Sequence, residues 1–169
     1  MLTVFCFDGE CSANCDDSVN FKIVTDRTEY SPGSALRATA LVTNSSTVPL
    51  YLFRSVTQGS SQIGSYRFTL IDPNGQTVRI QGCAADLFMD EVDVIHDFTD
   101  PKTGIALEWQ ESFGREQEIK LPTKKGVYHL QAELIPAALN TEQEESLLKH
   151  HMSIVRKACK AHDAVITLK

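Results

Sequence analysis

Two segments of this chain combine a turn with an alternating run of apolar residues, and they constrain the fold most strongly. The turn Tyr30-Ser31-Pro32-Gly33 precedes residues 35–43, and Gly126-Val127-Tyr128 opens residues 127–134. Side chains in a β-strand point alternately to its two faces, so an apolar period of two indicates a half-buried strand. The residues expected to face the core are Leu36, Ala38, Ala40, Val42, Tyr128, Leu130, Ala132 and Leu134.

Shorter runs with the same period predict further strands. Phe21 and Ile23 share one face, and the turn Asp72-Pro73-Asn74-Gly75 suits type I, because proline presets φ at its second position. The other expected strands span residues 49–53, 66–70, 77–80, 105–109, 116–121 and 164–168, with a polar loop over 59–64. Eight or nine short strands separated by turns favour an antiparallel β-sandwich over a sheet that alternates with helices.

One segment departs from this pattern and predicts an accessory helix over about residues 141–160, before the last strand. Thr141 can cap its N-terminus, and acidic residues follow in the first turn, where the helix dipole favours negative charge. An apolar stripe follows at helical spacing and consists of Leu148, Met152, Val155 and Cys159. Such an amphipathic helix is expected to pack on the sandwich.

Length and composition predict one domain with an N-terminal extension. The chain has 169 residues, of which 42% are apolar and 22% are charged, and this is enough for a core of ordinary size. Residues 1–19 are rich in turn formers and acids and lack a sustained period. We therefore expect a cysteine-containing N-terminal arm over residues 1–19 and a sandwich domain over residues 20–169.

The charge argues against two classes of partner. Binding to nucleic acid needs a basic face that releases counterions, whereas this chain has a net charge of −6. No apolar run approaches the roughly 20 residues of a membrane-spanning helix. Neither a nucleic-acid partner nor a membrane span is expected.

The sequence also resembles known families. Residues 26–33 (Asp-Arg-Thr-Glu-Tyr-Ser-Pro-Gly) and the strand after them resemble macroglobulin-type and related bacterial immunoglobulin-like domains, as do residues 121–128. The order of Asn44, the turn at Asp72 and Gly126-Val127-Tyr128 is similar to the bacterial intracellular proteinase inhibitor family. Both resemblances imply an all-β, immunoglobulin-like antiparallel sandwich. Tyr128 resembles a tyrosine corner, in which the phenol hydroxyl bonds back to upstream backbone.

The five cysteines allow several interpretations. Disulfides would join Cys6 to Cys15 and Cys83 to Cys159, although sequence alone does not fix the pairing. Zinc or an iron–sulfur cluster at Cys6, Cys11 and Cys15 is one alternative, but the spacing lacks a Cys-x2-Cys pair. Inert thiols are the other alternative. We expect disulfides and no metal. Five cysteines in an acidic domain favour a periplasmic or extracellular location over the cytoplasm.

An acidic stretch at residues 86–100 is the candidate binding surface. Its carboxylates are Asp86, Asp90, Glu91, Asp93, Asp97 and Asp100, of which the first five are the candidate binding residues. Several converging carboxylates can bind calcium, and two can catalyse glycoside hydrolysis, yet the spacing matches neither a calcium loop nor a marked catalytic pair. An acidic patch for a basic protein partner is the preferred interpretation.

These features predict a non-enzymatic interaction or accessory domain without a cofactor. Two alternatives belong to other classes. The first is a proteinase inhibitor that uses an exposed loop at residues 55–64, since rigid scaffolds carry binding function on loops. The second is a metal-dependent binder or hydrolase that uses the acidic stretch.

Overall fold

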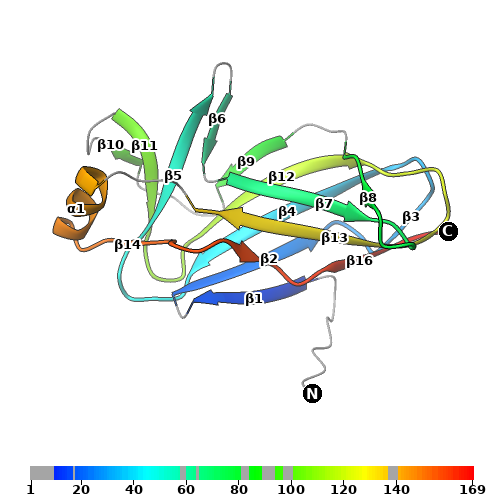
Figure 1. The fold of residues 1–169 in the computed structure, drawn as a ribbon, viewed down its shortest axis with the longest axis horizontal. Coiled ribbons are helices and arrows are strands. Elements are labelled where there is room, and N and C mark those ends of the chain that lie inside the picture. The colour runs from blue at the N-terminus through cyan, green and yellow to red at the C-terminus, as the bar shows by residue number, and fades with distance from the viewer. Residues whose placement is uncertain are drawn as a thin grey trace.

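The computed structural model describes residues 10–16, 18–57, 60–63, 65–80, 84–88, 94–96, 101–136 and 141–169. Strands dominate these residues and form three sheets (Figure 1). The predicted all-β fold is confirmed: the structure is a sandwich of mainly antiparallel sheets with one short helix.

The first sheet has the order β1-β2-β4-β12-β9, and every neighbouring pair is antiparallel. Its strands are β1 (Glu10–Asp16), β2 (Val19–Thr25), β4 (Ala35–Asn44), β12 (Ser112–Lys120) and β9 (Ala84–Phe88). The predicted alternation of β4 is confirmed, because Leu36, Ala38, Ala40 and Val42 have no exposed surface.

The second sheet has the order β3-β16-β13-β7-β8, with β15 added to β13. Its strands are β3 (Glu29–Tyr30), β16 (Ala164–Leu168), β13 (Gly126–Ile135), β7 (Ser65–Ile71), β8 (Thr77–Val78) and β15 (Cys159–Lys160). The apolar face of β13 is buried as predicted. A hydrogen bond of 2.9 Å from Gly75 N–H to the Asp72 carbonyl closes the predicted turn between β7 and β8.

The third sheet lies at one end of the sandwich, beside the helix (Figure 1). Its order is β10-β11-β5-β14, and β6 pairs with β5. The strands are β10 (Val94–His96), β11 (Pro101–Leu107), β5 (Leu50–Thr57), β14 (Ser153–Ile154) and β6 (Ser60–Ile63). The predicted loop at residues 55–64 is therefore largely a hairpin, in which Arg54 faces Ile63 and Thr57 faces Ser60. Polar residues sustain this ladder because its hydrogen bonds come from the backbone.

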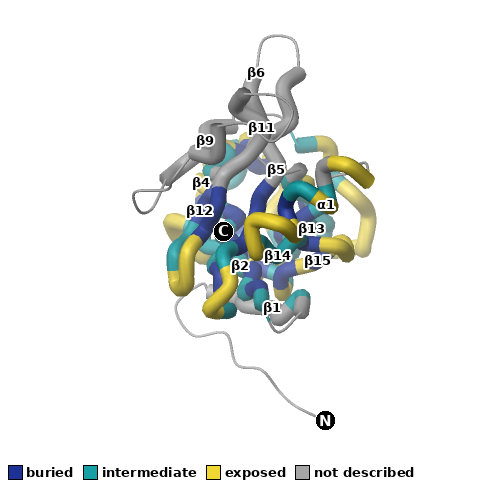
Figure 2. The backbone as a smooth tube through the Cα atoms, turned by 90° about the vertical axis from the view of Figure 1, so that its left-hand side faces the viewer, coloured by how far each residue is buried: buried dark blue, intermediate teal, exposed yellow. Residues whose placement is uncertain are grey.

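The core lies between the first two sheets, and the buried residues form one cluster inside the sandwich, which Figure 2 shows end-on. Tyr66 of the second sheet sits between Phe21 and Phe113 of the first, with ring centroids 6.1 and 6.3 Å away. Aromatic pairs at this spacing add to the free energy gained by burial. The core therefore holds the two sheets face to face.

A buried asparagine joins the first sheet to the third. Asn44 ends β4 and has no exposed surface. Its Nδ2 donates hydrogen bonds to the carbonyl oxygens of Leu107 at 2.7 Å and Val48 at 2.9 Å, and its Oδ1 accepts one from Ser46 N–H at 2.9 Å. The expected strand over residues 105–109 ends at Leu107 for this reason. Trp109 lies in the turn that follows and is 58% exposed.

The helix is shorter than predicted. Helix α1 (Thr141–Lys149) ends in a Schellman motif, in which Met152 N–H donates to the Leu147 carbonyl and His151 N–H donates to the Leu148 carbonyl, both at 3.0 Å. His151 occupies the left-handed position with φ of 56°. Glycine usually occupies this left-handed position after a helix. Because histidine occupies it here, the sequence did not reveal where the helix ends. The predicted stripe was also wrong, since Leu147 is buried while Leu148 is 57% exposed.

A disulfide joins Cys15 on β1 to Cys159 on β15 across the sandwich, with a Cα–Cα distance of 5.2 Å. The pairings considered from the sequence, Cys6 with Cys15 and Cys83 with Cys159, are therefore corrected. Residues 10–16, which the sequence analysis placed in the arm, form an edge strand paired with β2. The pairing of β1 with β2 and the disulfide both follow from the order of strands in the sheets. The spacing of cysteines along the sequence does not reveal that order. Cys6 and Cys83 lie outside the described residues.

We expect the substitution Asn44→Ala to lower the free energy of unfolding by about 3 kcal/mol, because it leaves two carbonyls and one N–H without their side-chain partner. The measurement is urea denaturation followed by near-UV circular dichroism. Ser46→Ala is the matched control on the exposed side of the same turn and should cost about 0.5 kcal/mol. Equal losses in the two variants would contradict the central role of Asn44.

Removal of the crosslink should also destabilise the protein. The disulfide closes a separation of 144 residues, so the variant Cys15→Ala/Cys159→Ala should lose about 2–5 kcal/mol through greater freedom of the unfolded chain. Guanidinium denaturation without reductant compares this variant with the wild type. An unchanged midpoint would show that the two cysteines are not joined in solution.

Candidate functional site

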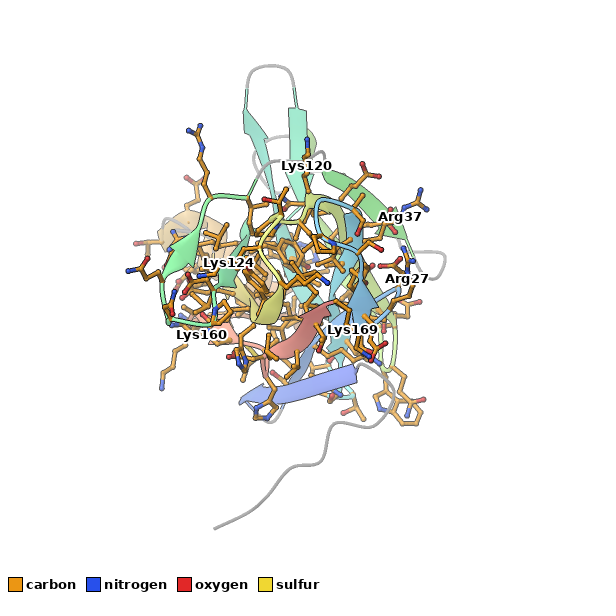
Figure 3. The ribbon with its side chains drawn as sticks, turned by 90° about the vertical axis from the view of Figure 1, so that its right-hand side faces the viewer. Arg27, Arg37, Lys120, Lys124, Lys160 and Lys169 are labelled. Atoms are coloured by element: carbon orange, nitrogen blue, oxygen red, sulfur yellow. A yellow bond between two sulfur atoms is a disulfide. The ribbon has the colours of Figure 1, made fainter. Side chains whose placement is uncertain are left out.

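One end of the sandwich is formed by three turns and is rich in cations; we call it the basic end. It comprises residues 26–37, the turn 72–75, residues 78–79, the connection 120–125 and Lys169. Figure 3 looks at the molecule from this side and shows labelled cations spread around it. The cations of the basic end are Arg27, Arg37, Arg79, Lys120, Lys124, Lys125 and Lys169.

Backbone hydrogen bonds fix the turn after Tyr30 against the connection between β12 and β13. Gly33 N–H donates to the carbonyl of Pro122, and Leu121 N–H donates to the carbonyl of Ser34, both at 2.9 Å. Gly33 has a φ of 77°, a left-handed conformation that glycine adopts without steric cost. The sequence Tyr-Ser-Pro-Gly thus places the backbone against residues 121–122.

Tyr128 holds the other side of this connection. Its hydroxyl donates to the carbonyl of Lys124 at 2.9 Å, which confirms the predicted tyrosine corner. Gly126 is required beside it, because a Cβ atom there would lie 2.6 Å from Cγ of Pro73. The turn 72–75 therefore packs against the start of β13 and becomes part of the same end.

Tyr30, like Tyr128, fixes a turn by hydrogen bonds from its hydroxyl group; we call its contacts with Asp26 and Arg27 the Tyr30 latch. Its hydroxyl lies 2.6 Å from Oδ1 of Asp26 and 2.7 Å from the carbonyl oxygen of Arg27, and it accepts a hydrogen bond from Arg27 N–H at 3.0 Å. Burial and the Asp26 carboxylate raise the pKa of Tyr30. Burial also raises the pKa of Asp26, but hydrogen bonds from Tyr30, the Arg37 N–H and Arg27 outweigh it, so this pKa lies below its ordinary value.

A hollow of about 210 Å³ opens at the basic end, between β8 and the end of β12. Leu121, only 2% exposed, contributes to its apolar lining. The lining residues are Val78, Arg79, Lys120, Leu121, Pro122 and Thr123. The hollow thus offers apolar surface flanked by two cations.

The cations of the basic end differ in how they are neutralised. Arg27 pairs with Asp26 at 3.3 Å, Arg37 pairs with Glu118 at 4.0 Å, and Lys169 pairs with Glu29. Hydrogen bonds from Gln76 and Asn74 lower the pKa of the Asp72 carboxylate, and the nearby Lys124 helps to lower it. By contrast, no described carboxylate forms an ion pair with Arg79, Lys120 or Lys125, and all three are exposed. Unneutralised positive charge therefore surrounds the hollow in a chain whose net charge is −6.

A second hollow of about 180 Å³ lies on the outer face of the second sheet and differs in charge. Its lining includes Arg67 and Glu133, which form an ion pair at 3.5 Å, together with Lys160. Since the arginine and the glutamate neutralise each other, this hollow presents less free charge to a ligand. The basic end is the stronger candidate site.

The acidic stretch predicted as a binding surface is described only at its start. Asp86 lies on β9, where its Cα faces that of Arg115 on β12. Asp90, Glu91, Asp93 and Asp97 lie outside the described residues, so the proposed patch stays a prediction. Among the described residues, no three His, Cys, Asp or Glu side chains gather as metal ligands would. Cys15 is engaged in the disulfide.

Sequence reasoning missed the basic end because it considered only the net charge of −6 and not where the lysines and arginines lie. A local signal existed, since Lys120, Lys124 and Lys125 fall within six residues. Arg79 gave no such signal, because only the packing of β8 beside the end of β12 brings it to the same hollow. No helix of the described residues is long and apolar enough to cross a membrane.

No protein-family model matches the sequence, and no curated protein matches it. Among solved structures, a family 123 glycoside hydrolase from Clostridium perfringens aligns with a TM-score of 0.44 and 13% identity. That alignment covers 83% of this chain, which spans 22% of the hydrolase chain. AvmM, described as catalysing macrocyclization in alchivemycin A biosynthesis, aligns with a TM-score of 0.42 and 9% identity over 90% of this chain and 89% of its own.

The ASH/PapD-like domain 7 of human CEP192 aligns with a TM-score of 0.34 and 13% identity, over all of this chain and 97% of its own. These likenesses are too distant to carry an argument about function. Function is therefore inferred from the residues of the basic end.

The substitution Tyr30→Phe should lower the free energy of unfolding by about 1–2 kcal/mol, because the Arg27 N–H loses its acceptor in a partly buried turn. It should also raise the pKa of Asp26, since the Tyr30 hydroxyl is the strongest of the hydrogen bonds that lower it. Carbon-13 NMR of the carboxyl group during acid titration measures this pKa.

The sign of the pH effect follows from the lowered pKa. Asp26 contributes stability that is fully present above its unfolded pKa, near 3.8, and lost as the pH falls through the lower folded value. The Tyr30→Phe variant should lose part of this contribution. An Asp26 pKa equal to that of the wild type would contradict the hydrogen bond between Tyr30 and Asp26.

Proposed function

We propose that this chain is a non-catalytic protein-interaction domain whose basic end binds an acidic segment of a partner protein. The observation that carries the proposal is the hollow lined by Leu121 and flanked by Arg79 and Lys120, whose charges no described carboxylate neutralises. Apolar floor and charged rim are the two components that a protein-binding patch needs.

Each component has its own role. Contact with Val78 and Pro122, which are partly exposed, removes apolar area from water and supplies the affinity. Arg79 and Lys120 attract carboxylates to the rim, which selects acidic partners and speeds association. Lys124 and Lys125 extend the positive field along the connection to β13. The bound segment should therefore carry an apolar side chain between acidic residues.

The scaffold suits this role because both sides of the hollow are fixed. The hydrogen bonds from Gly33 to Pro122 and from Tyr128 to Lys124 hold the connection before a partner arrives. A preformed surface avoids the entropic cost of ordering loops on binding. The disulfide from Cys15 to Cys159 fits an oxidising compartment, so we place the domain in an exported protein.

A labelled peptide, Glu-Glu-Leu-Glu-Glu, tests the proposal by fluorescence anisotropy at low salt. We expect binding that the double variant Arg79→Glu/Lys120→Glu weakens by at least about tenfold, since two favourable charge contacts become repulsive. Added salt should also weaken binding, because the exposed charges are screened.

The matched control is Lys149→Glu/Lys157→Glu, which changes the net charge equally but lies at the end of α1 and in the segment after it. This control should bind the peptide within about twofold of the wild type, because screening limits the reach of distant charges. Equal weakening in both variants, or no binding by the wild type, would overturn the proposal.

A further inference from the structure

The end of the sandwich opposite the basic end presents an exposed tryptophan. Trp109 is the only tryptophan of the chain and is 58% exposed, in the turn between β11 and β12. Val48, in the connection between β4 and β5, is 42% exposed. A large exposed aromatic side chain costs solvation free energy, and such residues anchor many protein interfaces.

The turn that carries Trp109 is held in place by Asn44. Gln110 N–H donates to the Asn44 carbonyl at 2.8 Å, and Asn44 N–H donates to the Glu111 carbonyl at 3.0 Å. Gln110 adopts a left-handed φ of 66° within this turn. Because the Asn44 side chain also donates to the carbonyl of Val48, the segments of both exposed apolar residues are anchored to one buried residue.

Acidic residues flank the tryptophan. Glu108 precedes it and is exposed, and the Glu111 carboxylate accepts a hydrogen bond from Glu108 N–H at 2.7 Å. The turn therefore presents an apolar side chain between two carboxylates. We call residues 108–111, with Val48, the acidic tip. This is the chemistry that the hollow of the basic end would bind.

The acidic tip and the basic end of one chain cannot meet. Strand β12 begins at Ser112, directly after the tip, and ends at Lys120, beside the hollow. Nine residues of strand span about 30 Å. The two complementary surfaces are thus held apart by a rigid strand, and contact between them requires two molecules.

We propose that the partner of the basic end is a second copy of this chain, bound head to tail, with Trp109 of one copy in the hollow of the next. The proposal rests on the proposed function of the basic end. The indole would cover the partly exposed Val78 and Pro122, while Glu108 and Glu111 would face Arg79 and Lys120 of the neighbouring copy. A hollow of about 210 Å³ has room for one aromatic side chain.

The geometry determines the kind of assembly. A head-to-tail contact uses two different surfaces, so a pair keeps one free tip on one copy and one free hollow on the other. Unless the rotation between copies closes a ring, further copies add at either end. The average mass in sedimentation velocity at low salt should therefore rise with concentration and pass the dimer without a plateau.

Complementation between two variants tests the head-to-tail contact. Trp109→Ala keeps the hollow and loses the tip, whereas Arg79→Glu/Lys120→Glu keeps the tip and loses the hollow. We expect each variant alone to stay at the monomer mass of 18.7 kDa. An equimolar mixture should form a dimer and nothing larger, because only one productive contact is possible.

Leu148→Ala is the matched control for the loss of exposed apolar area, since Leu148 is 57% exposed on α1. This variant should associate as the wild type does, and all variants should keep the wild-type circular dichroism spectrum. A mixture that stays monomeric, or a Trp109→Ala variant that associates as the wild type does, would overturn the inference.

The two proposals fail in different ways. If the acidic peptide binds the basic end while the wild type remains monomeric at every concentration, head-to-tail association is overturned. The proposed binding of an acidic segment from another protein is then retained. If the peptide does not bind, the proposed function is wrong, and the head-to-tail contact that depends on it is overturned with it.

Discussion

The structure depends on the hydrogen bonds of one buried asparagine. Asn44 ends β4 in the first sheet, and its side-chain amide donates to carbonyls at the end of β11 and before β5, both strands of the third sheet. Burying the amide of Asn44 costs free energy unless its N–H and C=O groups form hydrogen bonds. Those hydrogen bonds form only when the segments that carry Leu107 and Val48 lie as they do in this structure. Asn44 therefore sets how the two sheets join and where the acidic tip lies.

At the basic end, two tyrosines and two glycines fix the connections between strands. Tyr30 and Tyr128 each bond to backbone three or four residues upstream. Gly33 supplies a left-handed φ, and Gly126 permits close approach of the turn at Pro73. Both ends of the sandwich are thus fixed by side chains that bond to loops. The sheets act as the scaffold, and the proposed binding residues lie on the connections, where this fold usually carries function.

The sequence predicted the strands well and the connections less well. Alternation identified β4, β13 and β16 because burial of one strand face imposes a period of two on the residues themselves. It extended the helix past Lys149, since a left-handed histidine gives no sequence signal for a helix end. It also counted Trp109 as a strand residue, because the alternation continues past the point at which Asn44 turns the chain.

The sequence by itself determined the fold class, the apolar faces and the Asp72 and Tyr128 turns, since each follows from residues close together along the chain. Only the tertiary structure decided which cysteines pair, because Cys15 and Cys159 meet through the packing of β1 beside β15. The same is true of the hollow, where Arg79, directly after β8, meets Lys120, at the end of β12. Contacts between distant segments depend on sheet order and register, and local patterns of apolar residues do not encode either.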